Sequence, residues 1–304
     1  MTSKAQIAVI GAGLMGHGIA QVFALAGHRV AVYDPSADAL KSLRERVLRN
    51  LVDLGQDTTA TERVHPQDNL AECVAHVDVV IEAGPENLAF KRDLFVQLEA
   101  LAPAHALLCS NTSVIPITSI MSGLKSGQRA MGTHWWNPPY LVPLVEVIKT
   151  AKTSPTLAQQ MFDLLAAVGK TPAMVEKDVP GFIGNRLQHA LWREAIALVA
   201  EGVCDAQTVD TVVKASFGRR LPVLGPLENA DLVGIELTQA IHQLVLPHIN
   251  RSASASPYLQ ELLDAGHLGM KSGQGFRTWT PPQQAELRAQ LQAHLKAMNQ
   301  AEGR

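Results

Sequence analysis

A glycine-rich turn near the amino terminus constrains the fold more than any other stretch of the chain. The apolar run Ile7-Ala8-Val9-Ile10 leads into Gly11-Ala12-Gly13-Leu14-Met15-Gly16, and apolar residues with helical spacing follow. A strand, a G-x-G-x-x-G turn and a helix in this order form the fingerprint of a dinucleotide-binding βαβ unit. The glycines permit a tight turn, close approach of a pyrophosphate and close packing of the helix. The residues expected to hold the dinucleotide here are Gly11, Gly13, Leu14, Met15 and Gly16.

A carboxylate follows the second strand-like run of this unit. The run Arg29-Val30-Ala31-Val32-Tyr33 ends at Asp34, 23 residues after Gly11. An acid about 20 residues beyond the turn accepts a hydrogen bond from the ribose 2′-hydroxyl of NAD. It would repel the 2′-phosphate of NADP, so the sequence favours NAD. Arg29 and Lys41 keep an NADP-dependent reductase as an alternative.

The composition is that of a globular protein without a polyanionic partner. Of 304 residues, 47% are hydrophobic and 18% charged, and the net charge of −2 argues against nucleic-acid binding. No apolar stretch has membrane-spanning length, and no metal site is expected. The cysteines Cys73, Cys109 and Cys204 form no C-x-x-C pair, which favours buried thiols in a reducing compartment. Because the first strand starts within six residues of Met1, we expect no signal peptide and a cytoplasmic location.

Hydrophobic periodicity predicts two domains with different architectures. Strands and helices alternate up to about residue 180, which indicates an α/β domain with a mostly parallel sheet covered on both faces. Beyond it the pattern is helical. The expected domains are residues 1–179, a Rossmann-type NAD-binding domain, and residues 180–304, an all-α substrate and dimerisation domain. Further strands are expected at 63–65, 77–81, 106–110, 129–134 and 144–148, and helices at 37–54, 87–101, 155–168, 183–201, 206–216, 231–246, 258–265 and after Pro282.

One histidine and one glutamate have the chemistry that a dehydrogenase needs. His134 ends a predicted strand, and imidazole titrates near neutrality, as a general base for a hydroxyl proton should. Glu146 lies in the otherwise apolar strand 144–148, and a hairpin would bring its carboxylate back to His134. The alternatives are a structural histidine packed beside two tryptophans and a glutamate that faces water from an edge strand.

Two further polar residues lie where ligands bind in such sheets. Ser113 is in the polar loop after the strand 106–110, and Asn185 precedes a long helix. Taken alone, both positions also suit turn formation or helix capping.

Together these stretches resemble the 3-hydroxyacyl-CoA dehydrogenase family over nearly the whole chain. The resemblance rests on the run from Gly11 to Gln21, Glu86-Asn87-Leu88 with Lys91, and Ser110-Asn111-Thr112-Ser113. It continues through His134 with Asn137-Pro138, residues 144–149, Pro180-Gly181-Phe182-Ile183 with Asn185-Arg186-Leu187, and Lys271-Ser272-Gly273-Gln274-Gly275-Phe276.

The resemblance implies NAD-dependent oxidation of an L-3-hydroxy group to a 3-keto group, or the reverse. It makes His134 the general base and Glu146 its orienting partner, and it places Ser113 and Asn185 on the reacting oxygens of the substrate. Members of the family are usually dimers through the helical domain, so a homodimer is expected. The residues implied around the cofactor, besides Asp34 and the glycine turn, are Glu86, Lys91, Asn137 and Lys271.

Two departures from the family pattern concern the substrate. In acyl-CoA-specific members the helix after the second strand continues into a lysine-rich extension that contacts CoA, whereas residues 50–57 here contain no lysine. The usual His-Phe-Phe-Asn is His134-Trp135-Trp136-Asn137. Both departures resemble the branch that acts on carnitine, gulonate or hydroxymethyl-pyridine carboxylates. We therefore expect a small free 3-hydroxy acid, with Arg186, Arg219 or Arg220 as partners of its carboxylate.

Two alternatives to this substrate class and activity remain at this stage. The first is an acyl-CoA dehydrogenase of fatty-acid β-oxidation acting on the 3-hydroxy thioester. The second is a non-catalytic NAD(H)-binding protein, like the lens crystallins that derive from this family. Binding alone would not require the set His134, Glu146, Ser113 and Asn185, which argues for an enzyme.

Overall fold

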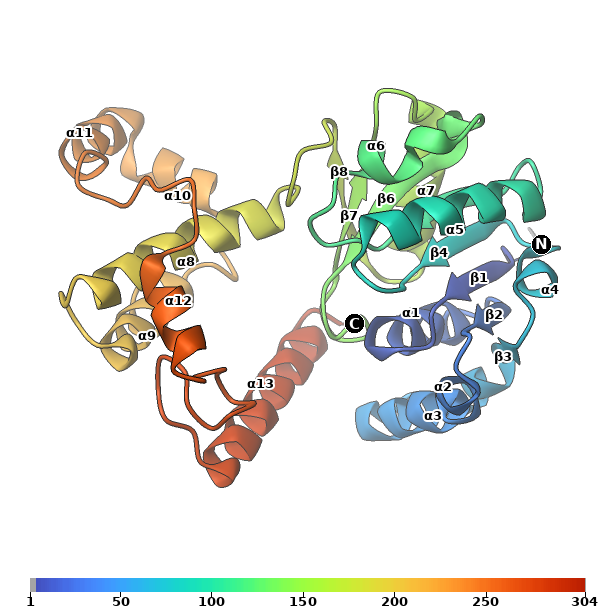
Figure 1. Cartoon of the computed structure of the whole chain (residues 1–304), viewed down its shortest axis with the longest axis horizontal. Helices are drawn as coiled ribbons and strands as arrows, with labels where there is room; N and C mark the ends of the chain where they lie inside the picture. Colours follow the sequence, from blue (N-terminus) through green and yellow to red (C-terminus); the bar gives the residue numbers. More distant parts are fainter. Residues whose placement is uncertain (1–3, 304) are drawn as a thin grey trace. The chain divides into compact units, whose positions relative to one another are not determined.

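The computed structural model describes residues 4–303 and contains one eight-stranded sheet, in the order β3-β2-β1-β4-β5-β6-β7-β8 (Figure 1). Neighbouring strands are parallel except β6 and β7, which are antiparallel. The predicted mostly parallel sheet is confirmed. The strands are β1 (Ile7–Ile10), β2 (Val30–Tyr33), β3 (Val64–Gln67), β4 (Val79–Glu82), β5 (Leu107–Ser110), β6 (Ala130–Trp135), β7 (Leu144–Ile148) and β8 (Thr171–Val175).

Helices cover both faces of this sheet because its strands are apolar on both sides. In β1, Ile7 and Val9 belong to one hydrophobic cluster, and Ala8 and Ile10 belong to the other. A strand buried on both faces requires such a continuous apolar run. The first cluster includes α1 (Leu14–Leu25), α2 (Ala37–Lys41), α3 (Leu43–Leu54) and α7 (Pro155–Ala167), and the second includes α4 (Leu70–Val74), α5 (Leu88–Leu101) and α6 (Ile117–Ile120). Short 3₁₀ helices lie at Thr58–Arg63, Met121–Gly123 and Gly127–Arg129.

Two expectations about individual elements were wrong, and one strand was missed. The helix predicted at 37–54 is interrupted at Ser42, which ends α2 and precedes α3. The helix predicted at 231–246 is two helices, α10 (Pro226–Val233) and α11 (Ile235–Val245). Gly234 separates them with φ +103°, a conformation that L side chains rarely adopt. Strand β8 was not predicted at all.

The described residues form two compact units. The first comprises the chain up to Arg186 together with the segment from Ala293 onward, and the second comprises Leu187–Gln292. The second unit is helical, as expected, and the boundary expected at residue 180 stays a prediction. Its helices, two of which extend into the first unit, are α8 (Gly184–Ala200), α9 (Ala206–Ala215), a 3₁₀ turn at Phe217–Arg219, α10, α11, α12 (Pro257–Asp264) and α13 (Pro281–Ala301). Within the described part of the chain, no helix has the length and apolar character needed to cross a membrane.

Candidate active site and its family

The glycine turn has the open surface that a pyrophosphate needs. Gly11 has φ +110°, and a Cβ there would lie 2.7 Å from the carbonyl oxygen of Ala83. A Cβ on Gly16 would lie 1.7 Å from the carbonyl oxygen of Gly11, so helix and turn can only touch at a glycine. A Cβ on Gly13 would meet nothing within 4 Å. Gly13 also begins α1 without a side-chain cap, which leaves the first N–H groups of the helix available for an anion.

Asp34 lies against this turn at the carboxyl end of β2. Its Oδ2 accepts a hydrogen bond from the amide of Ala12 at 2.7 Å, and its Oδ1 accepts one from the amide of Ser36 at 2.8 Å. These bonds fix the carboxylate beside the glycines. Its role as the acceptor of a ribose hydroxyl stays a prediction.

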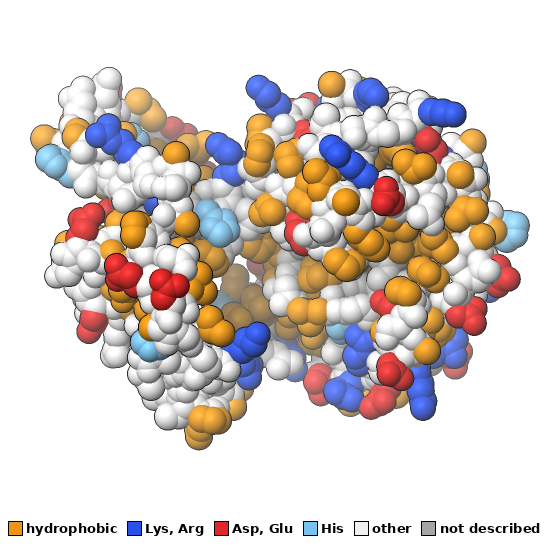
Figure 2. Space-filling model, viewed as in Figure 1, with side chains coloured by type: hydrophobic (Ala, Val, Ile, Leu, Met, Phe, Trp, Pro, Cys, Tyr) orange, Lys and Arg blue, Asp and Glu red, His pale blue; other side chains and the backbone are white. Residues whose placement is uncertain are grey.

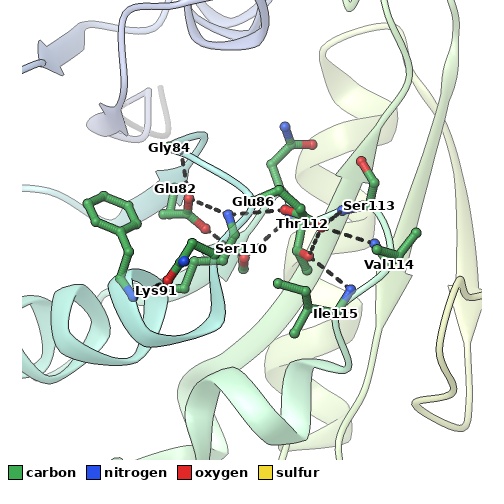
Figure 3. Close-up of polar contacts among 12 residues, drawn as sticks. Glu82, Gly84, Glu86, Lys91, Ser110, Thr112, Ser113, Val114 and Ile115 are labelled. Atoms are coloured by element: carbon green, nitrogen blue, oxygen red, sulfur yellow. Dashed lines mark hydrogen bonds and ion pairs between the residues drawn. The ribbon is translucent and has the colours of Figure 1, made fainter. Parts of the chain in front are cut away.

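A buried ion pair lies at the carboxyl end of β4, the strand next to β1 in the sheet (Figure 3). Glu82, the last residue of β4, accepts a hydrogen bond from Lys91 Nζ at 2.6 Å, and both side chains are at most 1% exposed. Glu82 also accepts hydrogen bonds from the amide of Gly84 and the hydroxyl of Ser110, each at 2.7 Å. Since buried charges must be paired and hydrogen-bonded, these contacts lock together the ends of β4 and β5.

Glu86 extends this cluster toward the polar loop that follows β5 (Figure 3). Its Oε2 lies 3.6 Å from Lys91 Nζ, and its Oε1 accepts hydrogen bonds from Thr112 Oγ1 at 2.6 Å and from the amide of Ser113 at 3.0 Å. Partial burial would raise the pKa of Glu86, but these hydrogen bonds and the charge of Lys91 hold it below its ordinary value. The side chain stays 40% exposed, so an ionised carboxylate faces solvent here.

His134 and Glu146 form a buried hydrogen-bonded pair. They are directly opposed across the antiparallel strands β6 and β7, as the predicted hairpin requires. His134 Nδ1 donates to Glu146 Oε2 at 2.8 Å, and the residues are 3% and 1% exposed. Because Nδ1 carries this bond, Nε2 is the ring nitrogen left to exchange a proton. The edge-strand alternative for Glu146 is thereby excluded.

The second oxygen of Glu146 is held by the turn that precedes α8. Its Oε1 accepts hydrogen bonds from the amides of Ile183 at 2.9 Å and Gly184 at 3.1 Å. Phe182 adopts φ +52°, which is uncommon for a residue other than glycine, and its buried ring lies 5.7 Å from the imidazole of His134. The turn therefore orients the acid of the pair and covers one side of the base.

The ionisation of Glu146 gives a test of this arrangement. Burial would raise the pKa of Glu146, but hydrogen bonds from His134 and the two amides hold it below the ordinary 4.5. A lowered pKa stabilises the fold fully above the unfolded-state value, and this contribution is lost as pH falls through the folded-state value. The excess Tm of the wild type over Glu146→Gln should narrow as the pH falls below about 4.5. A constant difference down to acid unfolding would contradict this account.

The other predicted residues are only partly brought together. Asn185 Nδ2 donates to the carbonyl oxygen of Ser113 at 2.8 Å, so these two share one location next to Glu86. Asn137 follows β6 by two residues and is exposed. Lys271 is exposed and belongs to the second unit. The substrate and cofactor roles of these four residues stay predictions.

Glu82 was not among the residues predicted for the site. The sequence does indicate this residue, because the carboxylate of Glu82 ends the apolar run Val79-Val80-Ile81 and a possible partner, Lys91, follows nine residues later. Asn111 was quoted only as part of a motif, but its buried side chain accepts a hydrogen bond from the amide of Trp135 at 2.9 Å. Both residues tie neighbouring strand ends together at the carboxyl edge of the sheet, where α/β proteins bind their ligands.

Comparison with known proteins identifies a family for both parts of the chain. Residues 6–179 match the family model described as the 3-hydroxyacyl-CoA dehydrogenase NAD-binding domain, and residues 181–279 match the model of its C-terminal domain. The chain is 34% identical to the 5-formyl-3-hydroxy-2-methylpyridine 4-carboxylate 5-dehydrogenase of Mesorhizobium japonicum, over 98% of each chain. It is 37% identical to a probable 3-hydroxybutyryl-CoA dehydrogenase of Bacillus subtilis, over 89% of this chain and 96% of that protein.

A solved structure agrees with these matches. The crystal structure of a 5-formyl-3-hydroxy-2-methylpyridine 4-carboxylic acid 5-dehydrogenase, described as an NAD⁺-dependent dismutase, superposes with a TM-score of 0.91. It is 33% identical and covers 99% of this chain and 100% of its own. The NAD-binding domain assigned from the glycine turn is confirmed, as is an enzyme rather than a binding protein. The chain belongs to the 3-hydroxyacyl-CoA dehydrogenase family and is an NAD-dependent dehydrogenase.

Proposed function

We propose that this enzyme oxidises the L-3-hydroxy group of a small free 3-hydroxy acid, or reduces the corresponding 3-keto acid. The observation that carries the proposal is the charge of residues 50–62, which contain Asp53, Asp57 and Glu62 and neither lysine nor arginine. The phosphates of CoA need cationic partners, and acyl-CoA-specific members resembling this chain supply them from a lysine-rich extension of this helix. Here α3 ends at Leu54, and Gly55 follows with φ +64°.

One relative that aligns over nearly its whole length supports the same substrate class. Its name gives a pyridine carboxylate as substrate, and it aligns over 98% of both chains. A 3-hydroxybutyryl-CoA dehydrogenase is somewhat more identical over a shorter alignment, so the acyl-CoA thioester remains the second candidate.

The geometry of the buried pair supports His134 as the general base. When bound, NAD supplies the acceptor for the hydride that leaves the carbinol carbon. His134 takes the hydroxyl proton at Nε2, while the ionised Glu146 at Nδ1 fixes the tautomer and stabilises the resulting imidazolium. Ser113 and Asn185, which lie together, orient the reacting oxygens. Arg186 follows Asn185 and is the first candidate partner for the substrate carboxylate.

A substrate panel tests this proposal. Purified protein and NAD⁺ are incubated at mildly alkaline pH with carnitine, gulonate, hydroxymethyl-pyridine carboxylates, 3-hydroxybutyrate and 3-hydroxybutyryl-CoA, and NADH formation is followed by absorbance. Turnover of at least one free acid with a higher kcat/KM than the thioester is expected. Saturable turnover of acetoacetyl-CoA in the reverse direction at micromolar concentration, with none on free acids, would refute the proposed substrate class.

We further propose that the second unit forms a homodimer. Of its described hydrophobic residues only Ala197 is buried, whereas Leu227, Leu232 and Leu244 are each more than 70% exposed. Hydrophobic side chains are visible on the surface of these helices in Figure 2. Monomeric proteins rarely expose such extensive apolar surface, and a second copy would cover it.

The mass of the particle in solution tests the dimer. Sedimentation equilibrium should give about twice the chain mass of 32.7 kDa. Leu232→Glu together with Leu244→Glu should shift the mass to that of one chain, because buried charges would oppose association. Glu261→Lys, a charge change on α12, serves as the control. A single-chain mass for the wild type would contradict the dimer.

We also propose a cytoplasmic location. The three cysteines are free, and Cys73 and Cys109 are buried, which suits a reducing compartment.

A further inference from the structure

An arginine that was not among the predicted site residues contacts the carbonyl groups of the glycine turn. Arg46 projects from α3, and its Nη2 donates to the carbonyl oxygens of Ala12 at 2.6 Å and Ala39 at 3.0 Å. Its Nη1 donates to the carbonyl oxygen of Gly13 at 3.4 Å. One guanidinium therefore contacts both carbonyl groups at the centre of the turn.

The charge of Arg46 is not neutralised by a salt bridge. Among residues 4–303, no carboxylate forms an ion pair with its guanidinium, and its buried Nε has no hydrogen-bond partner there. The contacts to carbonyl oxygens are charge-assisted but leave a full positive charge beside the turn.

A second donor acts on the same carbonyl group. His17 is 7% exposed, and its Nδ1 donates to the carbonyl oxygen of Gly13 at 2.9 Å. Burial lowers the pKa of His17, the bond to Gly13 opposes this, and the charge of Arg46 lowers it again, so the imidazole is neutral near pH 7. The permanent charge at this position therefore comes from Arg46.

Because the peptide bond is planar, the contacts to the carbonyl groups also determine where the N–H groups of Gly13 and Leu14 point. In a planar trans peptide the N–H points opposite to the C=O. Holding the carbonyl groups of Ala12 and Gly13 toward Arg46 therefore directs the N–H groups of Gly13 and Leu14 away from it. A Cβ at Gly13 would meet no atom within 4 Å, and Leu14 is 66% exposed, so both residues border open space. Hydrogen bonding of the carbonyl also polarises the N–H of the same peptide group.

We propose that Arg46 is a positioning residue for the pyrophosphate of NAD: it compensates the carbonyl dipoles of the turn, fixes the direction of the N–H groups of Gly13 and Leu14, and supplies a positive charge behind them. The inference rests on the cofactor site at the glycine turn and is independent of which hydroxy acid is oxidised.

Binding of cofactor fragments tests this role. The Kd of NADH is measured by fluorescence titration, and ADP and adenosine are measured by displacement of NADH, for the wild-type protein and for Arg46→Gln. The variant should bind NADH and ADP roughly 10- to 100-fold more weakly, as expected for loss of charge-assisted hydrogen bonds. Adenosine, which has no phosphate, should bind unchanged, and the dependence of NADH affinity on salt should become less steep.

Arg49→Gln is the matched control, since Arg49 lies on the same helix and forms an exposed ion pair with Glu45. It should leave all three affinities unchanged. If Arg46→Gln does not fold, Arg46→Lys replaces it. Lysine keeps the positive charge but lacks the planar guanidinium with its several N–H donors, so binding of NADH and ADP should still be weakened relative to binding of adenosine. An equal loss of affinity for adenosine and ADP would show that Arg46 has only a structural role. Unchanged NADH affinity in a folded variant would overturn the proposal. Because turnover is not measured, failure of the substrate assignment would leave these outcomes unaffected.

Discussion

Replacing His134 with glutamine should lower kcat for the oxidation of the hydroxy acid by roughly 10²- to 10⁴-fold, the usual contribution of a general acid–base group. Glutamine can still donate a hydrogen bond to Glu146 but cannot accept the hydroxyl proton. The affinity for NADH should not change, because His134 contacts Glu146 and the aromatic rings of Trp136 and Phe182, whereas the glycine turn lies between β1 and α1.

The measurement is steady-state turnover together with NADH titration of the same preparation. His105→Gln is the control, because His105 is an exposed histidine that pairs with Asp78 at the surface. It should retain full activity. Retention of most of the turnover by His134→Gln would show that the buried histidine is structural, which is the alternative that the sequence left open.

Replacing Lys91 with methionine should destabilise the protein by about 3–5 kcal/mol, because it leaves Glu82 as an uncompensated buried charge. Glu82 is 0% exposed, and its nearest cation is Lys91 at 2.6 Å. The free energy of unfolding in urea gives the value directly. The effect should be among the largest of any single substitution in this chain, since most substitutions change stability by less.

Two further variants distinguish charge from packing. Lys149→Met removes a cation whose partner, Glu176, is 73% exposed, so it should change stability by at most about 1 kcal/mol. The double variant Glu82→Gln/Lys91→Met should be more stable than Lys91→Met alone, because the unpaired carboxylate is gone. If the double variant were the less stable of the two, the loss would arise from packing and not from the buried charge.

The fold was predictable where local pattern and tertiary environment agree. Strand β7 has the predicted bounds Leu144–Ile148. This run is apolar except for one residue, which is the pattern of a buried strand. Strand β8 was missed because Thr171–Val175 includes Pro172 and is only partly buried, which weakens the usual strand signal. The break at Gly234 was missed because apolar spacing continues across it, and spacing does not reveal a positive φ.

The pair at the centre of the site was predictable for a related reason. His134 was predicted from its place at a strand end, and a lone glutamate in the next apolar strand needs a partner that a hairpin can supply, so the pair of His134 and Glu146 was predictable. Arg46 could not be found in this way. Its contacts with Ala12 and Gly13 join residues 33 and 34 positions apart, and they depend on how α3 packs beside the turn. Helical periodicity shows which face of α3 is apolar, but it does not show which residues of the turn that helix contacts.

The most direct test of the proposed activity compares two substrates that differ only in the group attached to the acid. The kcat/KM of NAD⁺ reduction is measured for (S)-3-hydroxybutyrate and for (S)-3-hydroxybutyryl-CoA with the same enzyme preparation. We expect the free acid to be the better substrate, because residues 50–62 offer the CoA phosphates three carboxylates and no cation. A kcat/KM for the thioester that exceeds the values for 3-hydroxybutyrate and for every other free acid of the panel would contradict the account and would place the CoA-binding residues elsewhere in the chain.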